Sequence, residues 1–97
     1  MSKKEINLET SQIPWHELQR FFASGLAIAV DSSIDLVEAA YQFSLDNKVQ
    51  VEQWVAEKKV APVSDHQALQ WYEDNATVWA TVIKPWVLVQ EKTDEKD

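Results

Sequence analysis

Five tryptophans in a chain of 97 residues, with one glycine and no cysteine, most strongly limit how this protein can fold. Each indole ring buries roughly 150–250 Å² when it lies inside a protein. A chain without cysteine forms no disulfide and no thiolate metal site, so apolar burial has to hold the fold together. The sequence therefore predicts a small domain with an aromatic core. The tryptophans are Trp15, Trp54, Trp71, Trp79 and Trp86.

The length of the chain fits one domain. Both ends are polar and charged and contain too few apolar residues to order themselves. We expect a flexible N-terminus over residues 1–9, a single globular domain over residues 10–90 and an acidic disordered tail over residues 91–97.

The net charge of −7 limits the classes of partner. An acidic surface repels the phosphates of nucleic acids and of anionic membranes, so neither partner is expected. No signal peptide is visible, and the longest clean apolar run, residues 26–30, is far too short to span a bilayer. These observations predict a soluble, cytoplasmic protein.

Hydrophobic periodicity predicts four helices. Gly25, the only glycine, follows the first helix where a left-handed C-terminal cap is expected. Ser64 with Gln67 matches a capping box before the fourth helix, and Asp46 is a candidate cap for the third. The predicted helices span residues 14–24, 33–45, 47–58 and 65–74.

Three short segments have the β-branched and aromatic content of strands: residues 26–30, 77–83 and 86–90. Residues 60–63 contain a proline and predict an edge strand or an extended link. A two-residue Lys-Pro loop is poorly specified for a hairpin, so we expect a wider turn or a bent strand at Pro85. The prediction is an α+β fold, with about four helices packed on a small, mostly antiparallel sheet of three or four strands.

The last two predicted strands carry more apolar surface than one covered face requires. If helices cover only one face of the sheet, the other face exposes aromatic side chains and becomes a candidate interface. The alternative is that both faces are covered within the domain. The candidate interface residues are Trp79, Thr81, Ile83, Trp86 and Leu88.

A second candidate site is polar. Asp35 and Glu38 are three residues apart and share one face of the second predicted helix, with Asp31 just before it. Paired carboxylates bind metals or transfer protons, and Arg20, the only arginine, is a candidate to join them. The alternative is a solvated helix face, because this is the only polar stripe on that helix.

Other catalytic patterns are absent from the sequence. Ser64, Asp65 and His66 are consecutive, so their side chains cannot converge into a triad, and a helix cap explains them better. The two histidines, His16 and His66, match no metal-ligand spacing, and one glycine excludes a glycine-rich phosphate loop. We therefore expect no catalytic residue, no metal site and no cofactor.

Four blocks of the sequence together resemble a family of small bacterial proteins called domain of unknown function 2288. The resemblance extends over about residues 9–91 and implies a bacterial, single-domain protein without an assigned activity. The blocks are residues 9–22, residues 35–38, residues 63–68 and residues 85–90.

Two functional hypotheses follow. The first is a non-enzymatic interaction or structural module that binds a partner protein or a second copy of itself through the strands around Trp79 and Trp86. The second is a small-ligand-binding protein or metal-assisted enzyme that uses the carboxylates near Asp31.

Overall fold

The computed structural model describes residues 4–6 and 10–92, and residues 4–6 are helical. Ten further elements follow in chain order. They are β1 (Ser11–Pro14), the 3-10 helix η1 (Trp15–Leu18), α2 (Gln19–Ala23), β2 (Ala27–Val30), α3 (Leu36–Ser44), α4 (Lys48–Ala56), β3 (Val60–Pro62), α5 (Asp65–Glu73), β4 (Thr77–Ile83) and β5 (Trp86–Glu91). Within the described part of the chain, no helix has the length and apolar character needed to cross a bilayer.

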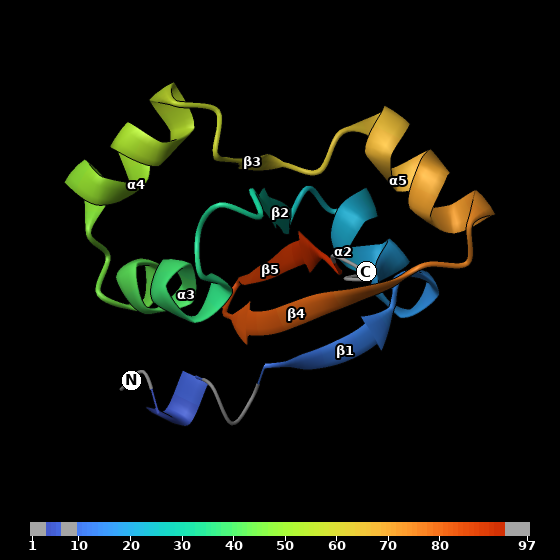
Figure 1. Ribbon diagram of the computed structural model, residues 1–97, viewed down its shortest axis with the longest axis horizontal. Coiled ribbons are helices and arrows are strands. Elements are labelled where there is room, and N and C mark those ends of the chain that lie inside the picture. The colour runs from blue at the N-terminus through green and yellow to red at the C-terminus, as the bar shows by residue number, and fades with distance from the viewer. Residues whose placement is uncertain (1–3, 7–9, 93–97) are drawn as a thin grey trace.

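The strands form one mixed sheet in the order β1-β4-β5-β2-β3 (Figure 1). The central pair, β2 and β5, is parallel, and the other three pairings are antiparallel. The predicted α+β class is confirmed, but the prediction of three or four strands was too low, since the sheet has five. The parallel pair follows from tertiary topology, because the chain returns to β2 only after three helices and two strands.

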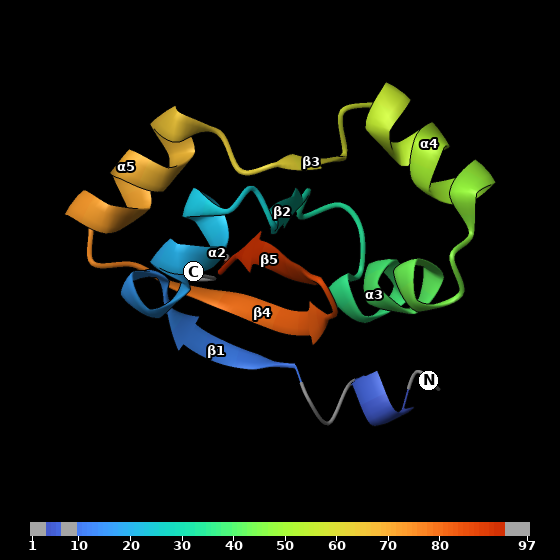
Figure 2. The same cartoon turned by 180° about the vertical axis from the view of Figure 1, so that it is seen from behind.

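Helices cover both faces of the sheet (Figures 1 and 2). Alternate residues of each strand point to opposite faces, so β5 places Leu88 in one core and Val87 and Val89 in the other. The first core lies against α3 and α4, with Trp54, Trp79 and Trp86 half-buried at its margin. The second core lies against η1, α2 and α5 and contains Trp15 and Trp71.

The N-terminal region differs from the prediction. Ile6, within the segment predicted to be flexible, is fully buried in the first core, and residues 11–14, which were not predicted as a strand, form β1 and pair with β4. Pro14 ends β1 and precedes η1, whereas the sequence placed it in the first turn of a helix. Glu91 ends β5, and the rest of the predicted tail from residue 93, with residues 1–3 and 7–9, lies outside the described residues.

The helix starts test the capping predictions. Ser64 caps α5, since its Oγ accepts a hydrogen bond of 3.1 Å from the backbone N–H of Gln67. Asp46 does not cap α4, because Asn47 holds that position and its Oδ1 accepts from the Gln50 N–H. The second predicted helix begins at Leu36, after Asp35, which makes no side-chain cap.

A tight turn joins β4 to β5, where the sequence predicted a wider turn or a bend. Ile83 pairs with Trp86, so only Lys84 and Pro85 form the loop, and the peptide bond between them is cis. Turns with a cis proline at the third position reverse the chain within four residues.

Four helices end with the same backbone hydrogen-bond pattern. After α2, the Leu26 N–H donates to the Phe21 carbonyl and the Gly25 N–H donates to Phe22, which is a Schellman motif. This motif needs a left-handed residue, and Gly25 has a φ of +75°. The ends of α3, α4 and α5 repeat the pattern with residues other than glycine, whose φ values are also positive. They are Asp46, Lys58 and Asn75.

These caps give a prediction for stability. A left-handed conformation costs a residue with a Cβ about 1 kcal/mol, partly offset because glycine has more freedom in the unfolded chain. Lys58→Gly should therefore raise the free energy of unfolding in urea by about 0.5 kcal/mol. Gly25→Ala should lower it by about 1 kcal/mol through backbone strain alone, because an added Cβ meets no atom within 4 Å. Equal effects of the two substitutions in the same direction would contradict this account.

Candidate functional site

The candidate interface residues lie on one face of β4 and β5. Thr81, Ile83 and Leu88 are buried beneath the helices of the first core, so they cannot form an exposed surface in this fold. Trp79 and Trp86 are half-buried at the edge of the same core. The sequence analysis left open whether helices cover one face or both, and the coverage of both faces removes most of this candidate surface.

One exposed apolar surface lies around the α3–α4 connection, and others include Leu69 and Tyr72 of α5. Leu45 and Val49 are 52% and 77% exposed. A hollow of about 290 Å³ beside this connection is lined by Phe43, Val51 and Trp86, together with polar residues that include Asp46 and Asn47. We call Phe43, Val51 and Trp86, which line the hollow, together with the exposed Leu45 and Val49 next to them in the chain, the Trp86 patch.

Helix α4 is unusual in how little it buries. None of its nine residues is buried, and Val49 and Val55 point apolar side chains at solvent. An amphipathic helix normally turns an apolar stripe toward the core. In α4, only Val51 and Trp54 are half-buried among its large apolar residues, so the helix covers the core incompletely.

The second candidate site is not assembled as the sequence predicted. Arg20 lies in α2 and places its guanidinium 5.3 Å from the centre of the Phe21 ring. Asp35 precedes α3, and the Glu38 carboxylate accepts a hydrogen bond from Gln42. Residues 4–6 and 10–92 contain no group of three histidine or carboxylate side chains that could hold a metal ion. Of the four predicted residues, Asp31 lines a cleft that Arg20, Asp35 and Glu38 do not line.

This cleft lies at the carboxyl ends of the parallel strands β2 and β5. Its volume is about 250 Å³. Ala29 pairs with Ala61 on one side and Val89 on the other, so small side chains of three neighbouring strands form its floor. Trp71 and Gln67 of α5 form a wall. Crevices beyond the carboxyl ends of parallel strands are common ligand sites in α/β proteins.

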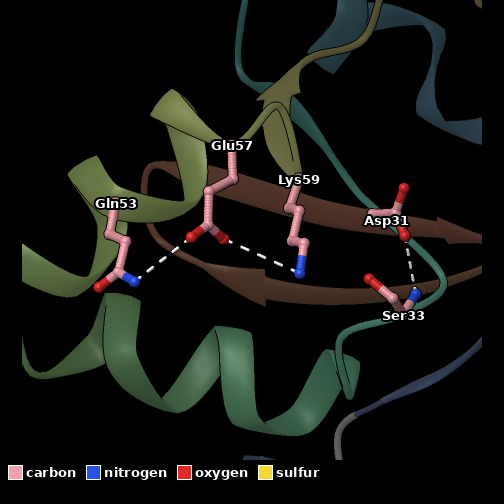
Figure 3. Close-up of polar contacts among 5 residues, drawn as sticks. All are labelled: Asp31, Ser33, Gln53, Glu57 and Lys59. Atoms are coloured by element: carbon pink, nitrogen blue, oxygen red, sulfur yellow. Dashed lines mark hydrogen bonds and ion pairs between the residues drawn. The ribbon is translucent and has the colours of Figure 1, made fainter.

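Charged groups of both signs surround the cleft. Its cationic lining residues are Lys58 and Lys59, from the connection between α4 and β3, and its anionic ones are Asp31 and Glu91. Asp31 and Glu91 each lie two residues beyond the parallel pair of Ala29 and Val89, and so at the same edge of the sheet. Figure 3 shows Lys59 extending between Glu57 on one side and Asp31 with Ser33 on the other. Lys59 Nζ is 3.8 Å from the Glu57 carboxylate.

Backbone and side-chain hydrogen bonds fix the position of Asp31. Its Oδ1 accepts a bond of 2.8 Å from the Ser33 N–H, and its own N–H donates to the Lys59 carbonyl at 2.8 Å. The Gln90 side-chain amide donates to the carbonyls of Asp31 and Ile34, at 3.0 and 2.6 Å, and so ties this loop to β5. Hydrogen bonds from the Ser33 backbone and side chain, with the nearby charge of Lys59, lower the pKa of Asp31.

This shift predicts how stability depends on pH. Because the folded pKa of Asp31 lies below its ordinary value, ionised Asp31 stabilises the fold above that value and loses the effect as pH falls through the folded pKa. Asp31→Asn should lower the free energy of unfolding at pH 7, and the difference from wild type should shrink below about pH 4. Urea titrations across pH measure this. A difference that stays constant with pH would assign the effect to packing.

Sequence reasoning found Asp31 but missed the rest of the cleft. Lys58, Lys59 and Gln67 come from segments that only the sheet brings next to β2. The one usable signal was the extended segment at residues 60–63, since its pairing with β2 brings the two preceding lysines to this edge. The parallel pairing of β2 with β5 had no local signal.

Comparisons with known proteins identify relatives of this chain. The sequence profile of a family described as "Protein of unknown function (DUF2288)" matches residues 1–91. A solved structure, described as the NMR solution structure of PA1075 from Pseudomonas aeruginosa, is 36% identical in sequence. It superimposes with a TM-score of 0.84 over 95% of this chain and 85% of that chain. Among functionally curated proteins, none is significantly similar to this chain.

Proposed function

We propose that this chain, which belongs to the DUF2288 family of proteins of unknown function, is a non-enzymatic protein-interaction module. Its binding surface in this proposal is the Trp86 patch. The observation that carries the proposal is the incomplete burial of α4, which has no buried residue and holds Val49 at 77% exposure. In this proposal the module acts in the cytoplasm, because a fold without disulfides is compatible with a reducing compartment.

The composition of the patch supports this proposal. Interfaces are enriched in aromatic anchors that are surrounded by apolar and polar contacts. Trp86 and Phe43 line a hollow that polar residues surround, including Asp46 and Glu52. A half-exposed tryptophan in such a hollow can gain further burial from a partner, at about 25 cal/mol for each Å² of apolar surface removed from water.

Self-association into a homodimer is the simplest form of the proposal, because it needs no second component. Sedimentation equilibrium from about 10 μM to about 1 mM covers the affinity range of weak dimers. Val49→Asp should raise the dissociation constant at least about tenfold, since it places a charge in the apolar contact. Val49 is mostly exposed, so this change should leave the monomer folded.

Leu69→Asp is the matched control. Leu69 is an exposed apolar residue of α5, at the other end of the molecule from α4 (Figure 1). The Leu69→Asp substitution should leave the dimer intact. If wild type is a monomer at all concentrations and Trp86→Ala leaves its mass unchanged, the homodimer is excluded.

Affinity capture from a bacterial lysate tests the second version of the proposal, in which the Trp86 patch binds a different protein. A protein retained by wild type and by Leu69→Asp, but not by Val49→Asp, supports the proposal. The proposal fails if the chain is a monomer and no protein is retained in this pattern.

A further inference from the structure

The cleft beside Asp31 has features that the interaction function leaves unexplained. It lies on the α5 side of the sheet, whereas Val51 and Trp86 of the Trp86 patch belong to the α3–α4 side. Small pockets with an apolar body and a few convergent polar groups are the usual form of ligand sites. This cleft is smaller and more polar than most, with an apolar floor and charged groups of both signs around it.

Several polar side chains that line the cleft have no partner within the described part of the protein. The side-chain amide of Gln67 makes no hydrogen bond there, although its backbone N–H is bound by Ser64. Lys58 and Glu91 make no ion pair there, and the Ser32 hydroxyl makes no hydrogen bond. Donors and acceptors therefore converge on the cleft without satisfying one another.

The arrangement of charge limits the class of ligand. The ammonium group of Lys58 would attract a carboxylate, with a further contribution from Lys59, which is also 3.8 Å from Glu57. Asp31 and Glu91 would repel a multiply charged anion such as phosphate. The two carboxylates would in turn attract an ammonium group. The floor of Ala29, Ala61 and Val89 can accommodate only a small apolar part of the ligand.

We propose that this cleft binds a small zwitterion of the α-amino acid class. The ligand carboxylate lies toward Lys58 and Lys59, and its ammonium group lies toward Asp31 and Glu91. The alanine floor and the indole of Trp71 contact its side chain. The volume of about 250 Å³ holds one amino acid and little else. This inference is independent of the Trp86 patch and survives if the interaction proposal fails.

The first experiment is an NMR titration of the ¹⁵N-labelled protein with a mixture of the protein amino acids, followed by the single compounds. Binding should shift the amides of Ser32, Lys59 and Gln67 and the indole N–H of Trp71. Acetate, methylammonium and inorganic phosphate each carry one kind of charge, and none should shift these signals at the same concentration.

Variants then test the charge assignment. Lys58→Gly removes one ammonium group and suits the left-handed backbone at this position, so folding is not at risk. It should weaken amino acid binding about tenfold, the loss expected for one charge-assisted contact. Lys84→Gln, in the β4–β5 turn, is the matched control and should leave binding unchanged.

Three outcomes overturn the proposal. One is the absence of any shift up to about 10 mM of amino acid, which is far weaker than functional binding. Another is phosphate or acetate binding as tightly as the zwitterion, which would make the site a simple anion site. The third is unchanged affinity in Lys58→Gly.

Discussion

Trp15→Ala should lower the free energy of unfolding by about 4 kcal/mol, a large share of the roughly 5–15 kcal/mol that stabilises a small domain. Trp15 is fully buried. Its ring centre is 5.0 Å from that of Trp71 in an edge-to-face contact and 5.9 Å from that of Phe22. Replacement by alanine removes these contacts and leaves a cavity where η1 meets α5. Urea denaturation at pH 7 measures the loss.

Trp15→Phe separates the size of the ring from its polar group. The indole Nε1 of Trp15 is buried without a hydrogen-bond partner in the described structure, which is a cost that phenylalanine does not have. The expected loss is about 1–2 kcal/mol, clearly less than for alanine. Trp54→Ala is the control, because Trp54 is only half-buried and its removal should cost less than that of Trp15. Equal losses for Trp15→Phe and Trp15→Ala would contradict this explanation.

Thr81→Val should raise the free energy of unfolding by about 1–2 kcal/mol. Thr81 is 1% exposed in β4, opposite Leu88, and its Oγ1 has no hydrogen-bond partner among the residues described. Valine has nearly the same shape, favours strands and removes the unpaired hydroxyl. The expected result is a higher denaturation midpoint in urea with an unchanged slope.

Thr77→Val is the matched control for this prediction. Thr77 is a half-buried threonine at the start of the same strand, and its substitution should change stability by less than about 0.5 kcal/mol. A loss of stability in Thr81→Val would show that its hydroxyl is hydrogen-bonded in solution, for instance to a buried water.

The position of most elements could be predicted because their signals are local. The Ser64 cap and the glycine after the first helix are set by hydrogen bonds within a few residues, and the strand at residues 77–83 was predicted with its observed bounds. The short strand β1 had no such signal. Its four residues include one half-buried side chain and a proline, and only pairing with β4 makes them a strand.

The candidate sites were less predictable than the elements. The sequence identified Asp31 and Trp86 as residues of interest, and each lines a hollow in the structure. Ile83, predicted beside Trp86, is its partner across the β4–β5 pairing, but the other residues that line the two hollows depend on strand order and helix packing. Asp31 meets Lys59 through the β2–β3 pairing, and Trp86 meets Val51 through the packing of α4.

The five tryptophans separate what the sequence determined from what the tertiary structure decided. Composition and periodicity alone determined a small α+β domain with an aromatic core, because burial of rings and the period of a helix or strand are properties of short segments. Trp15 and Trp71 lie in that core, whereas Trp54 is only half-buried. Which rings remain at the surface depended on the parallel pair at the centre of the sheet and on helices covering both faces. Long-range pairing has no local signature, so only the folded chain shows it.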